Sequence, residues 1–438
     1  MGGPAGAGAR VRSVPSGFHV LIAAQFVSGL ADNALLIVTI ARLDELGAPL
    51  WWAPLLKLGF TLAYVLLAPF VGALADAWPK AHVMFVSNGL KAAACALLVA
   101  GGDPLLAFTL AGIGAAAYSP AKYGLVTELL PPARLVAANG WIEVCTVGAI
   151  LLGTALGGLL VSPSAQTASA WMPPLADALL AGDAGGTRLL PALLTVLALF
   201  ALAGVLNLCI PDSGARYPRV APGRLLHQFA DDNRRLWGDP AGRVSLAVTT
   251  LFWGVGATLQ FVVLRWAEHS LGLDLHEAAG LQIATALGLI AGAVAAGRWL
   301  SLPNATRVLP LGIAMGLLVP WMTVIEHPLA AAPLLATVGA CAGFFVVPMN
   351  ALLQHRGHTL LSAGRSIAVQ NFNENLGVLA LLALYAALTA AGLPLPLLIW
   401  GLGGVVVLTM ASIAALHRRQ TRQGAHGPPL ANATPENA

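Results

Sequence analysis

Residues 211–243 read PDSGARYPRVAPGRLLHQFADDNRRLWGDPAGR and form a polar, arginine-rich stretch in a chain that is otherwise mostly apolar. Charged residues and Pro/Gly breaks divide the rest of the chain into apolar stretches, six on each side of this segment. Each is close to the roughly 20 residues that a helix needs to cross a bilayer. The polar stretch therefore separates two halves of six membrane-spanning helices.

The composition indicates that lipid is the main solvent of this chain. Of its 438 residues, 58% are hydrophobic and only 10% are charged, whereas soluble domains carry about 25% charged residues. That deficit excludes a water-soluble protein, and the spans leave no room for a separate soluble domain. We expect an all-α membrane protein with twelve transmembrane helices, at 18–40, 54–75, 82–101, 104–119, 136–160, 189–210, 244–266, 279–299, 308–326, 333–353, 363–391 and 395–416.

The distribution of charge predicts the orientation. Most of the 23 Lys and Arg residues, Lys122 and Arg365 included, fall on the side of both termini, whereas Lys57 is grouped with the opposite side. Loops that retain positive charge are cytoplasmic, so we expect both termini in the cytoplasm. The predicted organisation is a cytoplasmic N-terminus (1–17), a six-helix bundle (18–210), a cytoplasmic linker (211–243), a second six-helix bundle (244–416) and a disordered cytoplasmic tail (417–438). The first apolar run has no obvious cleavage site and is expected to be an uncleaved helix.

The two halves resemble each other weakly at a nearly constant offset. Pro120-Ala121-Lys122, which we place after the fourth span, matches Pro348-Met349-Asn350 in the tenth, 228 residues on. Asn139 with Glu143 opens the fifth span, as Gln370 with Glu374 opens the eleventh, and the same offset carries Asp32 to Gln260. Parallel six-helix repeats with a substrate site between them describe the major facilitator fold.

Polar residues inside the spans are candidates for a substrate path, because each charge at a helix centre costs roughly 2.5–3.5 kcal/mol. They form stripes at helical spacing: Gln25, Ser28 and Asp32 with Asn33 beside them; Asn139, Glu143 and Thr146; and Ser366, Gln370, Asn373 and Glu374. For Asp32 we weigh a substrate role against an interhelical salt bridge, and for Glu143 and Glu374 against gate ion pairs with Lys122 or Arg365. Lys91, in the middle of the third span, is interpreted as a structural partner of one of these acids.

The segment after the second span, GALADAWPK at 72–80, resembles the loop motif of the major facilitator superfamily, G-x-L-a-D-r-x-G-r-[KR]. Gly72, Asp76 and Lys80 match it, whereas Ala77 and Pro79 replace a basic residue and a glycine. The resemblance implies gating: the glycine permits close helix contact, and the aspartate caps a neighbouring helix.

A closer resemblance is to the bacterial lysophospholipid transporter family. It is carried by DNALL at 32–36, APFVG at 68–72, YSPAKYG at 118–124, ANG at 138–140, FFVVP at 344–348 and IAVQN at 367–371. The resemblance implies flipping of lysophosphatidylethanolamine and lysophosphatidylglycerol from the outer to the inner leaflet of the bacterial inner membrane, without obligatory ion coupling. An acyl-ACP synthetase/acyltransferase would then re-acylate them.

One position departs from that family, which has arginine where this chain has Gln260. Asp32 would then be neutralised by Lys91 or Lys122, or be satisfied by Gln260 and water. A lysophospholipid presents a phosphate, an acyl chain and, in the ethanolamine form, an ammonium. Asp32 and Glu143 could pair the ammonium, Lys122 the phosphate, and Tyr118 could flank the chain.

Two other classes of protein are weighed against this reading. A membrane acyltransferase with a His-x4-Asp motif is disfavoured, because the 211–243 loop is too short to fold a catalytic domain. A proton-coupled drug antiporter is the stronger alternative, although the glycine-rich run 148–158 lacks the proline of the antiporter signature. We expect a transporter rather than an enzyme, with no cofactor, no metal and no nucleic-acid partner.

Overall fold

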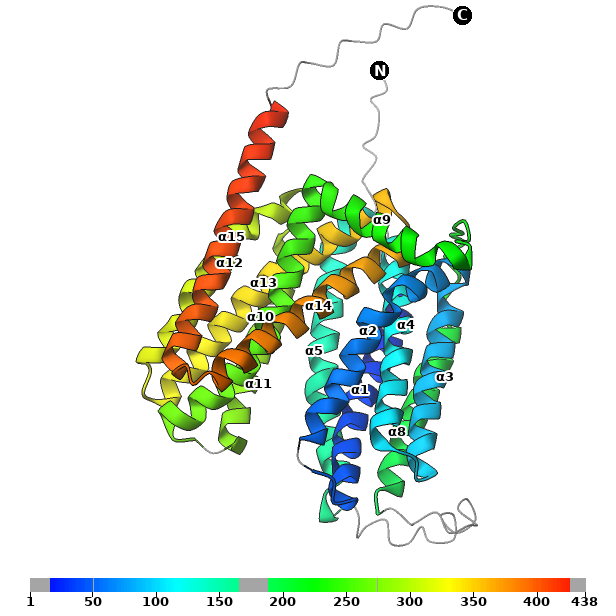
Figure 1. The fold of residues 1–438 in the computed structure, drawn as a ribbon. Coiled ribbons are helices and arrows are strands. Elements are labelled where there is room, and N and C mark those ends of the chain that lie inside the picture. Colours follow the sequence, from blue (N-terminus) through cyan, green and yellow to red (C-terminus); the bar gives the residue numbers. More distant parts are fainter. Residues whose placement is uncertain (1–15, 50, 165–187, 274, 426–438) are drawn as a thin grey trace, which may run out of the picture.

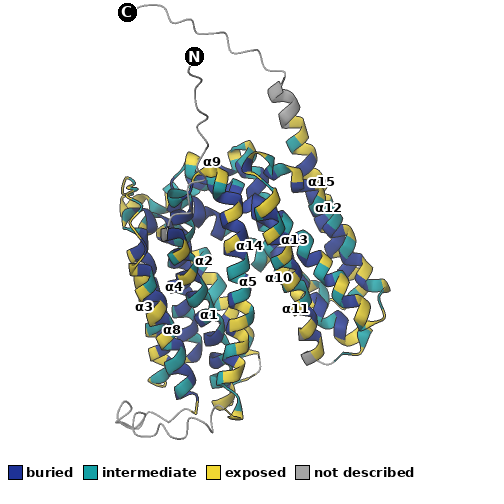
Figure 2. Cartoon of the chain, turned by 180° about the vertical axis from the view of Figure 1, so that it is seen from behind, coloured by how far each residue is buried: buried dark blue, intermediate teal, exposed yellow. Residues whose placement is uncertain are grey.

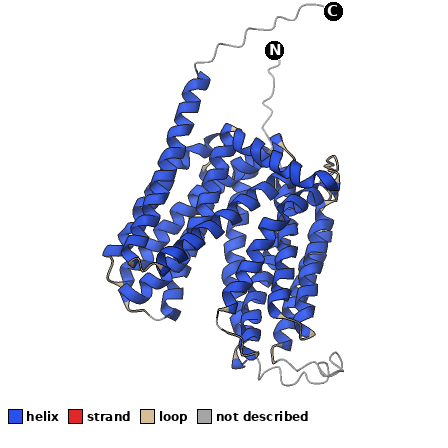
Figure 3. Cartoon of the chain, in the orientation of Figure 1, coloured by secondary structure: helices blue, strands red, loops and turns tan. Residues whose placement is uncertain are grey.

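The structure is a computed structural model that describes residues 16–49, 51–164, 188–273 and 275–425. Twelve of its helices are long and apolar enough to cross a membrane, which confirms the predicted number of spans within these residues. The described chain is helical with short connecting loops (Figure 3).

The helices form two bundles (Figure 1). The first bundle contains α1 (Ser16–Glu45), α2 (Trp52–Ala77), α3 (Lys80–Val99), α4 (Pro104–Leu129), α5 (Leu135–Leu160) and α8 (Leu190–Leu208). The second contains α10 (Pro240–Leu271), α11 (Leu275–Trp299), α12 (Leu309–Leu318), α13 (Pro328–Leu360), α14 (Ala363–Ala390) and α15 (Leu395–Ala425). A 3-10 turn at Pro132–Arg134 precedes α5, and another at Pro222–Arg224 precedes the linker helix α9 (Leu225–Gly238). Two more, at Leu302–Val308 and Val319–Val324, flank α12.

The helix starts follow the local sequence. Asp103 precedes Pro104 and accepts a hydrogen bond from the backbone N–H of Leu106 at 2.9 Å. Asp239 precedes Pro240 and accepts one from the N–H of Gly242 at 2.8 Å. In both cases the carboxylate satisfies an otherwise free N–H of the first turn, and proline suits the first helical position.

Several predicted boundaries are wrong. The fourth span does not end at residue 119, because Pro120 lies inside α4 just as Pro348 lies inside α13. A membrane helix continues through proline when its surroundings satisfy the freed carbonyl. Lys122 is therefore a helix residue rather than a loop residue. Lys57, which we grouped with the charges of the opposite side, lies inside α2 and within the span predicted at 54–75.

The linker and the tail also differ from the prediction. The linker holds the amphipathic helix α9 (Leu225–Gly238), and α10 already begins at Pro240 rather than near residue 244. α15 continues through residues 417–425, which we had assigned to a disordered tail. Most of the predicted N-terminal segment, and residues 426–438 of the tail, lie outside the described residues.

The bundles meet at one end only. We call the end at which α1 begins and α15 ends the terminal face, and the opposite end the distal face. Near the terminal face α14 packs on α2 and α4, and α11 and α13 pack on α5. Toward the distal face the two bundles diverge (Figure 1). Buried residues gather inside each bundle and where the bundles meet, and exposed residues lie along the outer helices (Figure 2).

Candidate functional site

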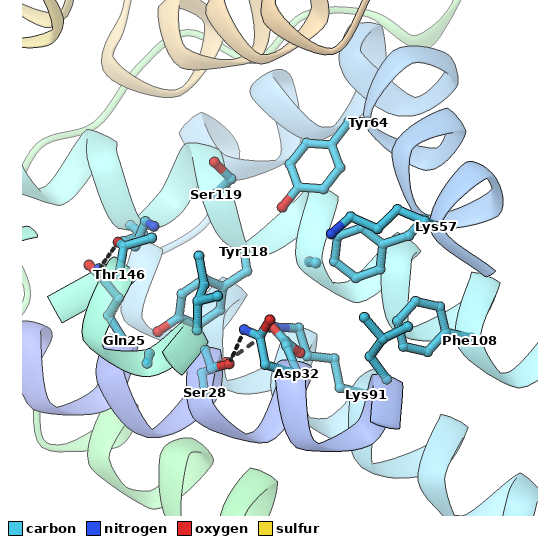
Figure 4. Close-up of a pocket in the computed structure, with 18 residues that line it drawn as sticks. Gln25, Ser28, Asp32, Lys57, Tyr64, Lys91, Phe108, Tyr118, Ser119 and Thr146 are labelled. Atoms are coloured by element: carbon cyan, nitrogen blue, oxygen red, sulfur yellow. Dashed lines mark hydrogen bonds and ion pairs between the residues drawn. The ribbon is translucent and has the colours of Figure 1, made fainter. Parts of the chain in front are cut away.

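A cavity of about 240 Å³ lies within the first bundle (Figure 4). Helices α1 to α5 supply its walls, and none of its lining residues comes from the second bundle. The lining combines lysine, aspartate, amide and hydroxyl groups with aromatic and aliphatic ones: Gln25, Ser28, Gly29, Asp32, Asn33, Leu36, Lys57, Phe60, Tyr64, Lys91, Phe108, Ala115, Tyr118, Ser119, Lys122, Thr146, Ala149 and Ile150.

An ion pair forms one wall of the cavity. Lys91 Nζ lies 2.7 Å from Asp32 Oδ2 and donates to Ser28 Oγ at 3.1 Å. Ser28 in turn donates to Asn88 Oδ1 at 2.8 Å. The ammonium also lies 5.0 Å from the centre of the Tyr118 ring, a cation–π distance. Lys91 is buried whereas Asp32 is partly exposed, so the carboxylate is the member of the pair that a ligand can reach.

Three side-chain oxygens of the lining have no hydrogen-bond partner among the described residues. They are Gln25 Oε1, Asp32 Oδ1 and the hydroxyl of Tyr118, all buried. A buried polar atom without a partner costs free energy that water or a bound polar group recovers. The cavity is thus built to receive hydrogen-bonding groups.

Eight of the residues singled out from the sequence line this cavity: Gln25, Ser28, Asp32, Asn33, Lys91, Tyr118, Lys122 and Thr146. Gln25 donates to Thr146 Oγ1 at 2.9 Å, which ties α1 to α5. Asn33 donates to the carbonyl of Gly29 within α1. The Lys122 ammonium lies 4.0 Å from the ring centre of Tyr123.

The other candidates for the substrate path do not line it: Asn139, Glu143, Gln260, Ser366, Gln370, Asn373 and Glu374. Asn139 and Gln354 of α13 exchange two hydrogen bonds of 2.9 Å across the two bundles near the terminal face. Gln370 donates to Glu374 at 2.8 Å, and Glu143 is buried in α5. Gln260 is exposed and its carbonyl accepts from Gln282. It does not join Asp32 in the cavity, because the bundles diverge there.

One wall of the cavity was not predicted from the sequence. Lys57, Phe60 and Tyr64 of α2 all line it, and Lys57 and Tyr64 enter from the side opposite Asp32 in Figure 4. Their spacing, i, i+3 and i+7, places them on one face of the helix. The same spacing singled out Gln25, Ser28 and Asp32, so this signal was present in the sequence.

At the terminal face, the loop motif joins the two bundles. Asp76 of α2 is buried and accepts hydrogen bonds from Ser362 Oγ at 2.5 Å, from Gly364 N at 2.8 Å and from Arg365 N at 3.1 Å. These groups begin α14, so Asp76 caps a helix of the other bundle. Gly72 permits this contact, since a Cβ there would lie 2.7 Å from the Cβ of Ala368.

Lys80 connects the motif to α4 and the linker. Its ammonium lies 2.6 Å from Glu128 Oε1 and 3.5 Å from Asp76 Oδ1. Glu128 also accepts from Tyr217 and Ser213 at 3.0 and 2.6 Å. Gly72, Asp76 and Lys80 therefore lie in one network that holds α2, α4, α14 and the linker together.

Two further ion pairs hold the linker against the second bundle. Arg365 donates to both oxygens of Asp232 in α9, at 2.7 and 2.5 Å. Arg356 of α13 does the same to Asp239, at 3.1 and 2.5 Å. Partial burial opposes ionisation of Asp239, but the hydrogen bonds from Arg356 and Gly242 outweigh it and lower the pKa of this carboxyl. Planar two-point pairs of this kind also fix the orientation of the helices.

Comparison with known proteins identifies relatives over nearly the whole chain. Residues 21–381 match the model of the Major Facilitator Superfamily. The chain is 40% identical to "Lysophospholipid transporter LplT" of Cronobacter sakazakii, over 92% of this chain and 96% of the relative. It is 38% identical to the protein of the same name from Klebsiella pneumoniae, with the same coverage.

Solved structures share the fold at low sequence identity. A bacterial homologue of the iron transporter ferroportin, in an outward-facing state, matches with a TM-score of 0.67 at 17% identity. FucP, a Major Facilitator Superfamily transporter in the outward conformation, matches with a TM-score of 0.68 at 15% identity. Each match covers 93% of this chain and 99% of the other.

Proposed function

The chain belongs to the lysophospholipid transporter family of the Major Facilitator Superfamily, and from this premise we propose that it flips lysophospholipids from the outer to the inner leaflet of a bacterial inner membrane. The observation that carries the proposal is the cavity beside the Asp32–Lys91 pair. It combines both signs of charge with the apolar side chains of Leu36, Phe60 and Phe108, which is what a head group attached to one acyl chain requires.

Alternating access is the mechanism that this fold supports. The bundles pack together at the terminal face and diverge at the distal face. The terminal face also carries the arginines of the linker, the start of α1 and the end of α15, so it is the cytoplasmic side in our proposal. The state described here is then closed to the cytoplasm, and a lipid reaches the cavity from the outer leaflet.

The cavity residues have distinct roles in this proposal. Lys122 binds the phosphate of the head group as a point charge. The partly exposed carboxylate of Asp32 accepts from the ammonium or hydroxyl groups of the head group. Gln25, Asn33 and Tyr118 supply further polar contacts along the path. Asn139, Glu143, Gln370 and Glu374 lie nearer the terminal face and serve the gate, whereas Gln260 has no role in the state described here.

The transport is of an unmodified lipid, without catalysis and without a bound cofactor. A lysophospholipid delivered to the inner leaflet needs a fatty acyl group to become a bilayer lipid again. We therefore propose functional coupling to an acyl-ACP synthetase/acyltransferase, which would remove the product and keep the net flow inward.

The test uses the purified protein in proteoliposomes, with lysophosphatidylethanolamine labelled on its acyl chain and extraction by albumin to read the leaflet. We expect movement between leaflets without an imposed proton gradient. Asp32→Asn should slow it roughly tenfold or more, because Lys91 is left as a buried charge without a counter-charge. Asp44→Asn, the same change at an exposed position of α1, should leave the rate unchanged.

Two results would contradict the proposal. Lipid movement that requires an imposed proton gradient, and that stops when an uncoupler dissipates this gradient, would indicate a proton-coupled mechanism. A protein that leaves the lipid in place but exports cationic dyes would be a drug antiporter.

A further inference from the structure

The charges that line the cavity are unequal. Its lining holds three lysines, Lys57, Lys91 and Lys122, but only one acid, Asp32. Asp32 is already paired with Lys91 at 2.7 Å. Within the described part of the chain, neither the Lys57 nor the Lys122 ammonium has a carboxylate within 4.0 Å. The nearest acid of the adjoining helix α5, Glu143, is buried outside the lining. The cavity therefore carries an excess of positive charge.

The lysines stand at successive depths along α4. Gly59, two residues after Lys57, packs against Thr109 of α4, and Lys91 packs against Gly114. At 1.5 Å per residue, the level of Lys91 lies about 8 Å beyond that of Gly59 and so about 11 Å beyond that of Lys57, and Lys122 lies about 12 Å further. α2 and α4 both begin at the distal face, so Lys57 is the lysine nearest to the open end.

Lys57 is placed to meet a head group first. It is exposed and still lines the cavity, and in Figure 4 its amine and the Tyr64 hydroxyl lie on the same side of it. Phe60, one turn along α2, and Phe108 supply apolar surface next to it. An ammonium and a hydroxyl above an apolar wall suit a phosphate that carries an acyl chain.

From this arrangement we propose that Lys57 is the entry site for the lipid phosphate, and that the cavity prefers lysophospholipids of net negative charge to zwitterionic ones. This inference rests on the proposed function. A phosphoglycerol head group brings one negative charge that the unpaired lysines attract. A phosphoethanolamine head group adds an ammonium that both lysines repel, and the one acid of the lining that it can reach, Asp32, also has to neutralise Lys91.

The experiment compares two substrates in the same proteoliposomes, made of neutral phosphatidylcholine so that the membrane surface adds no charge. Lysophosphatidylglycerol and lysophosphatidylethanolamine carry the same labelled acyl chain. We expect the wild-type protein to flip the glycerol form several-fold faster. Lys57→Gln should slow the glycerol form about threefold to tenfold, the ethanolamine form less, and bring the ratio of rates close to one.

Two variants serve as controls. Lys57→Arg keeps the charge and should keep the preference. Arg42→Gln removes a positive charge near the same face from a residue that pairs with Glu45 and does not line the cavity, and should leave the ratio unchanged. Thermal unfolding of each variant in detergent checks that the protein is folded.

The outcomes separate the two proposals. If both lipids move but their ratio is one, or is unchanged by Lys57→Gln, the charge preference is wrong and the proposed function stands. If neither lipid moves, the proposed function fails and this inference fails with it. Glycerophosphoglycerol, which lacks the acyl chain, should not compete at equal concentration; competition by it would show that the site binds soluble phosphodiesters instead.

Discussion

The contact between Asp76 and the start of α14 gives the sharpest test of the gate. In Asp76→Asn, one carboxylate oxygen becomes an NH2 group. If it replaces Oδ1, the N–H of Gly364 loses its acceptor; if it replaces Oδ2, the N–H of Arg365 does. Ser362 can rotate its hydroxyl, but a backbone N–H cannot. Either orientation therefore leaves at least one buried donor at the junction of the bundles unpaired.

The size of the effect follows from these contacts. An unpaired buried donor costs about 1–3 kcal/mol, and hydrogen bonds to a charged acceptor are worth about 1 kcal/mol more than neutral ones. All of these bonds cross between the bundles, so the loss falls on the state that is closed at the terminal face. A loss of about 2–4 kcal/mol shifts the ratio of closed to open molecules by roughly 30-fold to 1000-fold.

The assay measures the distance between the bundles at this face. Spin labels at Ala133→Cys, before α5, and Thr359→Cys, at the end of α13, occupy exposed positions of the two bundles. The four native cysteines are first replaced by alanine. We expect one short distance in the parent protein, and a second, longer population in Asp76→Asn.

The control is Asp212→Asn, the same change in the linker. Asp212 pairs with Arg216 at the surface, where both side chains are about half exposed, and this change should leave the distances as they are. If folded Asp76→Asn kept the single short distance, the cap on α14 would not be what holds the gate closed.

Two further changes probe the same face. Asn139→Ala should lower the melting temperature and leave the Gln354 amide without its partner, so Gln354→Ala should have a smaller effect in that background. A double-mutant cycle should give a coupling free energy of about 1 kcal/mol. Strictly additive effects would contradict a direct contact between the two side chains. The lowered pKa of Asp239 predicts a pH dependence. The stability that this group contributes is present above its ordinary value of 3.8 and is lost as the pH falls through its lower folded value. Below pH 4 the difference in melting temperature between the parent protein and Asp239→Asn should therefore shrink, and a constant difference would refute the assignment.

Some of the residues that line the cavity can be predicted from helical spacing alone. Gln25 and Asp32 were found because polar residues at helical spacing in an apolar helix stand out, and Lys57 could have been found in the same way. It lies near the start of α2, and a lysine near the end of a span is ordinarily interpreted as part of the adjacent loop. For Lys122 the spacing is misleading, because Pro120 is a common end of a helix and indicates a loop, whereas α4 continues through it to Leu129.

The partners of these residues could not be read from the spacing. Three partners were open for Asp32, and the structure places it beside Lys91 of the same bundle. Gln260, at the matching position of the repeat, is exposed on the other bundle. Asn139 and Glu143 share a helical face with Thr146, but only Thr146 lines the cavity, because the bundles already close around the deeper part of that face.

The sequence by itself determined that this chain lies in a membrane, how many times it crosses, and which few charges within the spans need an explanation. The reason is that each charged side chain, and each backbone N–H or C=O without a hydrogen bond, costs free energy in lipid on its own. A membrane span must therefore be apolar and helical over its own length, and this is visible in the local sequence. Only the tertiary structure decided which charged side chains form ion pairs with each other. Pairing depends on how each helix is rotated and how the two bundles are inclined, and these are set by packing along the whole length of the helices. The Asp76 cap on α14 shows the difference: the motif was readable in the sequence, but the helix that it holds lies in the other half of the chain.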